Sequence, residues 1–506
     1  MMNLDLIPES ARAAGLGALM KGAGMVTRFL PIPQPTLLVG PGASARLGQA
    51  VAGFGHDKVL IVTDAMIVRL GLLQPLTAAL QAGGTPYAVF DEITPDAPIP
   101  LIERGIAAFR EHECDALVAV GGGSSMDAAK AIAIASANPG KSLRRLAGYF
   151  KGLQSPPPVY AVPTTAGTGS EVTVAAVIAD PERQSKLVIV DTRLVPKVAA
   201  LDPSLMTGLP PAITAATGMD ALTHAVEAFL GQWATPATDS LALTAVGLIF
   251  ENLRTAYRDG ADLQAREKMA LASTYAGMAF TRANVGYVHA IAHQFGGRYH
   301  TPHGLANAIV LPQVLRFSAP AVTERLAQLA VRARLGEEGM NEEVLAERFL
   351  DAIDALNRDL GIPTTLAALR EADIPALAAA ALHEAHTGYP VPRYMTRAEC
   401  EALIRRLLPP QAAGDPPAKK AAARKGSAKN TPAKTAPAKK APAKSAAAKQ
   451  APAAKPAATK PGATKPVATK PVAKKPAAAK PAASKSPAGK PAARKAAAKT
   501  SPGTAG

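Results

Sequence analysis

The first half of the chain alternates short apolar runs with longer stretches of helical periodicity. Strands are expected at residues 58–63, 87–90, 116–120 and 159–162, which are rich in Val, Ile, Leu and Ala. Helices are expected between them, at about 67–81 and 100–111. Strands that alternate with helices in this way are typical of βα units around a largely parallel sheet.

Beyond Pro210 the strand pattern ends and apolar residues recur at helical spacing. Helices are expected at about 212–230, 241–253, 264–280 and 342–360. The pattern stops near Leu408, where Pro409-Pro410 precede a change in composition. We therefore expect a fold of class α/β plus α, divided into an N-terminal extension (1–29), an α/β domain (30–205), an all-helical domain (206–410) and a tail (411–506).

The tail differs sharply in composition from the rest of the chain. The chain has 56 Lys and Arg against 39 Asp and Glu, a net charge of +17, but residues 416–506 hold 22 of the basic residues and no acidic, aromatic or histidine side chain. Lysine recurs every five residues from 455 to 495, and proline follows most of these lysines, which forbids a continuous helix. We expect a disordered polycation that binds nucleic acid or another polyanion by counterion release, with a purely solubilising tail as the alternative.

Other features of the sequence narrow the class of protein. Two cysteines, Cys114 and Cys400, are too few for a disulfide framework or a thiolate zinc site, which favours a reducing compartment. No uncharged apolar run reaches the roughly 18–20 residues that a membrane span needs. The first thirty residues lack the pattern of a secretory signal. We expect a soluble cytoplasmic protein without a membrane span.

Histidines cluster in the helical half of the chain. Asp220 and His224 are four residues apart in an otherwise apolar helix, so both side chains leave the same face. His289 and His293 repeat that spacing, and His303 follows shortly after them. Carboxylate oxygen together with imidazole nitrogen suits a catalytic divalent transition metal, and hydrogen-bonded histidines without a metal are the alternative.

Two loops in the α/β half have the composition of a ligand site. Gly121-Gly122-Gly123-Ser124 lie between a buried strand and a helix, where a phosphate could meet the N–H groups of a helix N-terminus. The run is not the G-x-G-x-x-G dinucleotide fingerprint, so a purely structural turn is the alternative. Thr164, Thr165 and Thr168 form a second hydroxyl-rich loop at another strand end, the edge where open α/β sheets bind ligands. Asp64 ends the first strong strand and could accept hydrogen bonds from a ribose, or could serve only in a turn.

Four segments taken together resemble the iron-containing (group III) alcohol dehydrogenases, over about residues 30–408. They are Gly121-Gly-Gly-Ser-Ser-Met-Asp-Ala-Ala-Lys130, Pro163-Thr-Thr-Ala-Gly-Thr-Gly-Ser-Glu171, Ala216-Thr-Gly-Met-Asp-Ala-Leu-Thr-His224, and His289-Ala-Ile-Ala-His-Gln-Phe-Gly296 through Pro302-His-Gly304. The resemblance implies a Rossmann-like NAD-binding domain followed by an all-helical metal-binding domain. It also implies that Asp220, His224, His289 and His303 hold the metal, Fe²⁺ with Zn²⁺ as the alternative. Glu227, three residues after His224, is the weakest candidate, as a helix-surface residue or a supporting partner.

The same resemblance implies a set of cofactor contacts. They are Gly122, Gly123 and Ser124 at the pyrophosphate, Thr164 and Thr165 near the nicotinamide half, and Lys186. Asp64 matches a position where an acidic residue favours NAD, because its charge repels a 2′-phosphate. His293 would be a catalytic or positioning residue close to the nicotinamide, and not a metal ligand.

This chain departs from the family pattern at two places. The family often has Asn-Pro where this chain has Asp96-Ala97, and Asn-Pro-Arg where it has Val391-Pro-Arg393. These changes concern substrate and cofactor detail and not the class of reaction.

We therefore expect a metal-dependent, NAD-linked alcohol dehydrogenase that interconverts a small primary alcohol or diol and its aldehyde, as a homodimer or higher homo-oligomer. A hydroxyacid–oxoacid transhydrogenase on the same site is one alternative. A lyase resembling dehydroquinate synthase would need a cluster of Lys and Arg around the metal, and residues 286–304 offer only Arg298. A third alternative is a polyanion-associated protein whose tail is the main functional element.

Overall fold

The structure is a computed structural model that describes residues 30–183 and 185–410, together with the isolated residues 15, 22 and 24. The basic tail, and all but those isolated positions of the expected N-terminal extension, lie outside the described residues.

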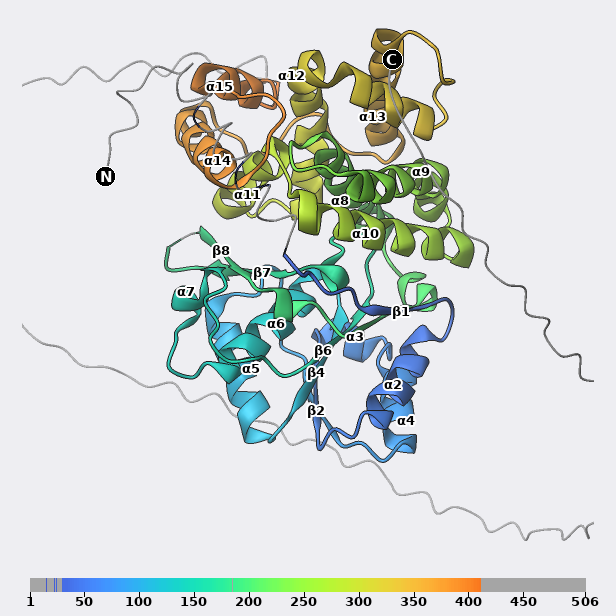
Figure 1. The fold of residues 1–506 in the computed structure, drawn as a ribbon, viewed down its shortest axis with the longest axis vertical. Coiled ribbons are helices and arrows are strands. Elements are labelled where there is room, and N and C mark those ends of the chain that lie inside the picture. Colours follow the sequence, from blue (N-terminus) through green and yellow to red (C-terminus); the bar gives the residue numbers. More distant parts are fainter. Residues whose placement is uncertain (1–14, 16–21, 23, 25–29, 184, 411–506) are drawn as a thin grey trace, which may run out of the picture. The chain divides into compact units, whose positions relative to one another are not determined.

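A six-stranded parallel sheet forms the centre of the first half (Figure 1). Its strands, in spatial order, are β1 (Thr36–Val39), β9 (Val198–Leu201), β6 (Val159–Pro163), β4 (Ala116–Gly121), β2 (Val59–Val62) and β3 (Tyr87–Phe90). Every neighbouring pair is parallel. The structure thus confirms the predicted fold class, an α/β part with a parallel sheet and a helical part.

Helices cover both faces of this sheet, which explains the continuous apolar runs of its central strands. Alternate residues of β2 point to opposite sides, because Leu60 and Val62 belong to one apolar cluster and Val59 and Ile61 to another. The first cluster includes α5 (Ile99–Glu111) and α6 (Gly123–Ala137). The second includes α2 (Ala43–Gly53) and α4 (Gln74–Ala82), which lie on the other side of the sheet in Figure 1.

The prediction of a single helix at 67–81 is wrong, because two helices occupy this stretch. α3 (Ala65–Arg69) ends after one turn, and α4 starts at Gln74. Gly71 lies between them with a φ of 69°, a left-handed conformation that glycine adopts without steric cost and that ends a helix.

A second sheet was not anticipated from the sequence pattern. It contains β5 (Gly148–Tyr149), β8 (Ser185–Val190) and β7 (Ala175–Asp180), and the β7–β8 pair is antiparallel. β7 alternates between half-buried and buried residues, with Ala176 and Ile178 inside, as expected of a strand covered on one face. β7 contains the apolar run 175–179 and β8 the run 187–190, so both strands could have been recognised in the sequence. β5 has only two residues, which is too short for such a pattern.

The second half is built from helices alone within the described residues. They are α8 (Pro211–Leu230), α9 (Pro236–Arg258), α10 (Leu263–Ala283), α11 (Tyr287–Tyr299), α12 (His303–Arg332), α13 (Glu342–Asp359), α14 (Ile374–Gly388) and α15 (Arg397–Arg405). α8 is surrounded by α9, α10 and α12, so it is buried over most of its circumference. α12 has the length and apolar composition to cross a membrane, but it packs against α8, α11 and α13 as a core helix does.

A short loop from the sheet meets the helical half at α10. Gly169, with a φ of 60°, approaches α10 so closely that a Cβ there would lie 2.7 Å from Gly277 Cα. Close by, the Thr274 hydroxyl donates to the buried Glu171 carboxylate over 2.7 Å. The loop that follows β6 is therefore attached to the helical half through glycine packing and a buried hydrogen bond.

The same loop is attached to α6 by a buried lysine. Lys130 is 0% exposed, and its Nζ donates to oxygens of Ser170, Thr173 and Ala175 at 2.6–3.0 Å. Burial lowers the Lys130 pKa to about 8, against the attraction of Asp127 and Glu171. One ammonium group thus joins the helix after the glycine run to the loop that reaches α10.

We expect Lys130→Met to lower the free energy of unfolding by about 2–4 kcal/mol, because several buried oxygens lose their donor. Urea denaturation would measure the change. Lys151→Met, at an exposed position, should change stability by less than about 0.5 kcal/mol. An equal effect of the two substitutions would contradict the assigned role of Lys130.

Candidate metal and cofactor site

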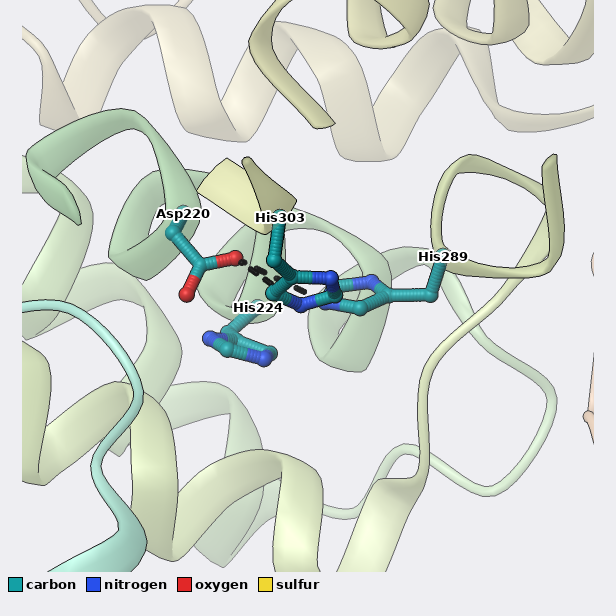
Figure 2. Close-up of side chains that lie close together, drawn as sticks. All are labelled: Asp220, His224, His289 and His303. Carbon is teal, nitrogen blue, oxygen red and sulfur yellow. Dashed lines mark ion pairs between the residues drawn. The ribbon is translucent and has the colours of Figure 1, made fainter. Parts of the chain in front are cut away.

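Three helices bring together the four residues proposed from the sequence as metal ligands. α8 contributes Asp220 and His224, α11 contributes His289, and His303 is the first residue of α12. One potential ligand atom from each lies within 4.8 Å of the others, and Figure 2 shows the side chains converging. Asp220, His224 and His289 are at most 5% exposed. The site is therefore a buried cluster of oxygen and nitrogen donors.

The approach of α12 to α8 depends on the glycine that follows His303. A Cβ at Gly304 would lie 2.3 Å from the Ala216 carbonyl oxygen, a distance no side chain tolerates. With glycine at this position, His303 Nε2 comes to 3.4 Å from Asp220 Oδ1. The Pro-His-Gly sequence is thus explained by close packing as well as by its histidine.

The histidines of the cluster are neutral in this environment. Burial lowers the His303 pKa to about 3, lowers the His289 pKa well below its ordinary value, and lowers the His224 pKa as well. A neutral imidazole keeps a lone pair for a metal ion. The electrostatics therefore suit ligation and not a set of charged ion pairs.

The side-chain amide of Asn307 lies where the carboxylate and two of the imidazoles of the cluster converge. Its Nδ2 lies 2.6 Å from Asp220 Oδ1 and 3.2 Å from Nε2 of both His289 and His303. One amide group with two hydrogens faces one carboxylate oxygen and two imidazole nitrogens, so it cannot donate to all three at once. A divalent cation fits this donor set of one carboxylate and several imidazoles.

Glu227 lies directly behind one of the proposed ligands. Its Oε2 is 2.6 Å from His289 Nδ1, and its Oε1 accepts from the Val288 N–H over 2.7 Å. Burial raises the Glu227 pKa to about 7, although backbone N–H groups oppose this. A carboxylate on Nδ1 leaves Nε2 as the coordinating nitrogen. Glu227, ranked weakest from the sequence, thus contacts a proposed ligand without joining the cluster.

His293 lies beside the cluster and outside it. Its ring stacks on His303 with centroids 5.3 Å apart, and its Nδ1 is 2.6 Å from a Glu384 oxygen. The four-residue spacing from His289 therefore placed His293 near the site without making it part of the donor set.

The glycine run and the threonine loop lie against each other at adjacent strand ends. A Cβ at Gly122 would be 3.3 Å from Thr165 Oγ1, and one at Gly123 would be 2.7 Å from Thr168 Cγ2. The Thr164 N–H donates to the Gly121 carbonyl over 2.9 Å. No side chain caps the start of α6, so its first N–H groups are available to an anion.

Asp64 follows β2 at the same edge of the sheet and has two possible uses. Its Oδ1 accepts from the N–H groups of Met66 and Ile67, at 2.8 and 3.0 Å, and so caps α3. Its Oδ2 faces the glycine run, because it lies 3.9 Å from a Cβ built at Gly121. The two roles considered from the sequence are therefore compatible.

Lys186 reaches the site from β8, between the two halves. Its Nζ pairs with Asp96 Oδ1 at 3.0 Å and lies 3.9 Å from a Cβ built at Gly296 of α11. The Asp96 N–H donates to Ser124 Oγ over 3.2 Å. Asp96 and Ala97 have φ values of 65° and 41°, a conformation the usual Asn-Pro could not share, since proline fixes φ near −65°.

Some residues of the site were missed from the sequence. Asn307 follows His303 by four residues, so helical spacing could have indicated it. Glu384 is 91 residues from His293, and no local pattern indicated that pair. Lys130 lies in the glycine segment, but its partners are defined only by the fold.

Comparison with known proteins agrees with this geometry. Residues 34–203 match the model of the iron-containing alcohol dehydrogenases, and residues 214–408 match the C-terminal model of the Fe-containing alcohol dehydrogenase family. The chain belongs to the iron-containing alcohol dehydrogenase family. It is therefore an oxidoreductase.

This chain aligns with other members of the family over about three quarters of its own length and over nearly all of theirs. A 1,3-propanediol dehydrogenase of Klebsiella pneumoniae is 44% identical over 371 residues, 72% of this chain and 95% of the relative. An NAD-dependent methanol dehydrogenase of Bacillus methanolicus is 39% identical over 386 residues, 76% of this chain and 100% of the relative. A crystal structure of a 1,3-propanediol oxidoreductase has 42% identity and a TM-score of 0.72, and covers 75% of this chain and 100% of its own.

We expect Glu227→Gln to weaken metal binding about 10- to 100-fold, because the amide no longer holds His289 with its charge-assisted hydrogen bond. Competition against a chelator of known affinity would measure the change. Glu343→Gln, at an exposed position of α13, should leave metal affinity unchanged. Equal affinity in the Glu227 variant and the unsubstituted protein would show that Glu227 does not support the metal.

Proposed function

We propose that this protein is a metal-dependent, NAD-linked dehydrogenase that interconverts a small primary alcohol or diol and its aldehyde. The convergence of Asp220, His224, His289 and His303 supports the proposal most directly. A divalent ion would supply Lewis acidity to the alcohol oxygen there, and NAD would accept or return the hydride.

The four clustered residues would hold the ion. One carboxylate and three neutral imidazoles leave part of the charge of a divalent ion uncompensated. Iron is expected from the family, and the same nitrogen and oxygen donors also suit zinc. Burial of the ligands excludes water from most of the site and strengthens electrostatic interactions within it.

The cofactor would lie across the strand ends of the α/β half. Gly122, Gly123 and Ser124 would meet the pyrophosphate at the start of α6, where glycines allow close approach. Thr164, Thr165 and Lys186 would contact the nicotinamide half, between the glycine run and the helices. Asp64 would turn its free Oδ2 toward the adenosine ribose and disfavour a 2′-phosphate.

His293 would contact the reacting groups without binding the ion. Its ring lies against His303, and its side chain is only 18% exposed. We assign His293 the role of accepting the hydroxyl proton of the alcohol or of the cofactor ribose. In the reverse direction it would return that hydrogen.

Asp96 favours an uncharged substrate. Lys186 is a cation near the cluster, and its field is among the causes that lower the His303 pKa, after burial and other charges. The Asp96 carboxylate forms an ion pair with this lysine over 3.0 Å and so offsets its positive charge. A substrate carboxylate would then have to displace Asp96 to reach a cation, which argues for alcohols and diols over hydroxyacids.

Further properties remain predictions from the sequence. We expect a cytoplasmic enzyme that forms a homodimer or higher homo-oligomer, with the domain limits given above. Residues 416–506 form a polycation that should bind nucleic acid or another polyanion with an affinity that falls steeply as salt rises.

Metal content and NAD-linked turnover together test the proposed function. Protein purified without a histidine tag should contain about one iron or zinc per chain and oxidise short primary alcohols or diols, with 2-hydroxyacids as much weaker substrates. His289→Ala should lose metal and activity together, because one ligand of a small donor set is missing. Metal-free protein that turns over no alcohol would refute the proposal, and hydride exchange between hydroxyacid and oxoacid without free NAD would favour the transhydrogenase.

We expect Asp64→Asn to raise kcat/KM with NADP relative to NAD by about tenfold, equivalent to about 1.4 kcal/mol. Asparagine keeps the cap of α3 but removes the charge that repels a 2′-phosphate. Steady-state kinetics with both cofactors would measure the ratio. Glu103→Gln, at an exposed position of α5, serves as the control, and an unchanged ratio in the Asp64 variant would mean that this carboxylate does not select the cofactor.

A further inference from the structure

Glu384 is a carboxylate with three hydrogen-bond partners at the edge of the site. It lies on α14 and faces α11, where His293 Nδ1 is 2.6 Å from its Oε1 and Gln294 Nε2 donates to its Oε2 over 2.9 Å. The Tyr389 hydroxyl donates to its Oε1 over 2.6 Å. Contacts from two directions therefore fix the orientation of this carboxylate.

The hydrogen bonds keep Glu384 ionised. Burial opposes ionisation, but the bonds from His293, Tyr389 and Gln294 outweigh it and hold the Glu384 pKa below its ordinary value. An ionised carboxylate can only accept hydrogen bonds. The hydrogen of the His293–Glu384 bond therefore sits on Nδ1, so of the two ring nitrogens Nε2 is the one that can carry an accepting lone pair.

The packing of α14 on α11 maintains this arrangement. Two residues beyond Glu384, His386 Nε2 lies 2.8 Å from the Tyr287 hydroxyl near the start of α11. That hydroxyl also accepts from the Met395 N–H over 2.8 Å. The His293 ring is contacted by the Glu384 carboxylate at Nδ1 and by the His303 ring, which stacks on it.

We infer that Glu384 is a positioning residue that holds the His293 ring with Nδ1 protonated and Nε2 free to accept a hydrogen bond at the reaction site. The inference rests on the proposed function, because only in that function does His293 accept from a hydroxyl of the alcohol or the cofactor ribose. It concerns the orientation and tautomer of the ring. The carboxylate acts on the reaction only through that ring.

The deciding variant is Glu384→Gln, which preserves size and packing. Its amide can turn a donor toward Nδ1, which would place the ring hydrogen on Nε2 and remove the acceptor from the site. We expect kcat to fall about 10- to 100-fold, less than the roughly 10²–10⁴-fold contribution of a complete general acid–base group, because the His293 ring itself remains. KM for alcohol and NAD should stay within about twofold and metal content should be unchanged, because no proposed ligand is touched. Glu384→Asp, which still accepts but is shorter, should recover part of kcat.

A double-substitution cycle with His293→Ala separates positioning from general damage. If Glu384 acts through His293, then Glu384→Gln should cause no further loss of kcat in the His293→Ala background. Additive losses in the double variant would overturn the inference, and so would wild-type kcat in Glu384→Gln. Glu371→Gln, an exposed carboxylate paired with Arg405, is the matched control and should retain full activity.

The outcome can be told apart from failure of the proposed function. If the unsubstituted protein lacks metal and turns over no alcohol, the proposed function fails and the inference falls with it. If that protein is active and the cycle is additive, only the role of Glu384 fails. Loss of metal in Glu384→Gln would also overturn the inference, because it would assign Glu384 to the metal site.

Discussion

The buried carboxylate of Asp220 is the constraint on which the helical half depends. Its ion pairs among the described residues are with His289 and His303, both of which burial holds neutral, so no positive side chain compensates it. Burying an uncompensated charge costs several kcal/mol, which a bound cation offsets. The packing of α8, α11 and α12 has to satisfy this requirement, and Gly304 is the residue that lets α12 approach α8 closely enough.

A second requirement is a defined distance between the phosphate loop and the metal cluster. Hydride transfer depends on close and oriented approach of donor and acceptor carbons. In this protein the loop after β6 makes the connection, because Lys130 ties it to α6 and Glu171 and Gly169 tie it to α10. Polar groups on this path are buried and paired, which makes the connection stiff.

The site uses one device twice, a carboxylate on Nδ1 of a histidine. Glu227 holds a proposed ligand, His289, and Glu384 holds His293, which lies outside the donor set. In each pair the carboxylate leaves Nε2 available, for a cation in the first and for a hydrogen bond in the second. The same chemistry thus serves two functions, and only the position of the ring relative to the cluster distinguishes them.

The sequence by itself determined the class of fold, the family and the residues with ligand chemistry. It did so because buried parallel strands, helical spacing and glycine turns are local properties of the chain, visible at Val59–Val62, at Asp220 and His224, and at Gly121–Gly123. Only the tertiary structure decided which groups meet. The break between α3 and α4 depends on the backbone angle of Gly71, and the Asp96–Lys186 ion pair and the contact of Glu384 with His293 join segments far apart in sequence. No periodicity reports such contacts, because long-range packing and buried hydrogen bonds select them.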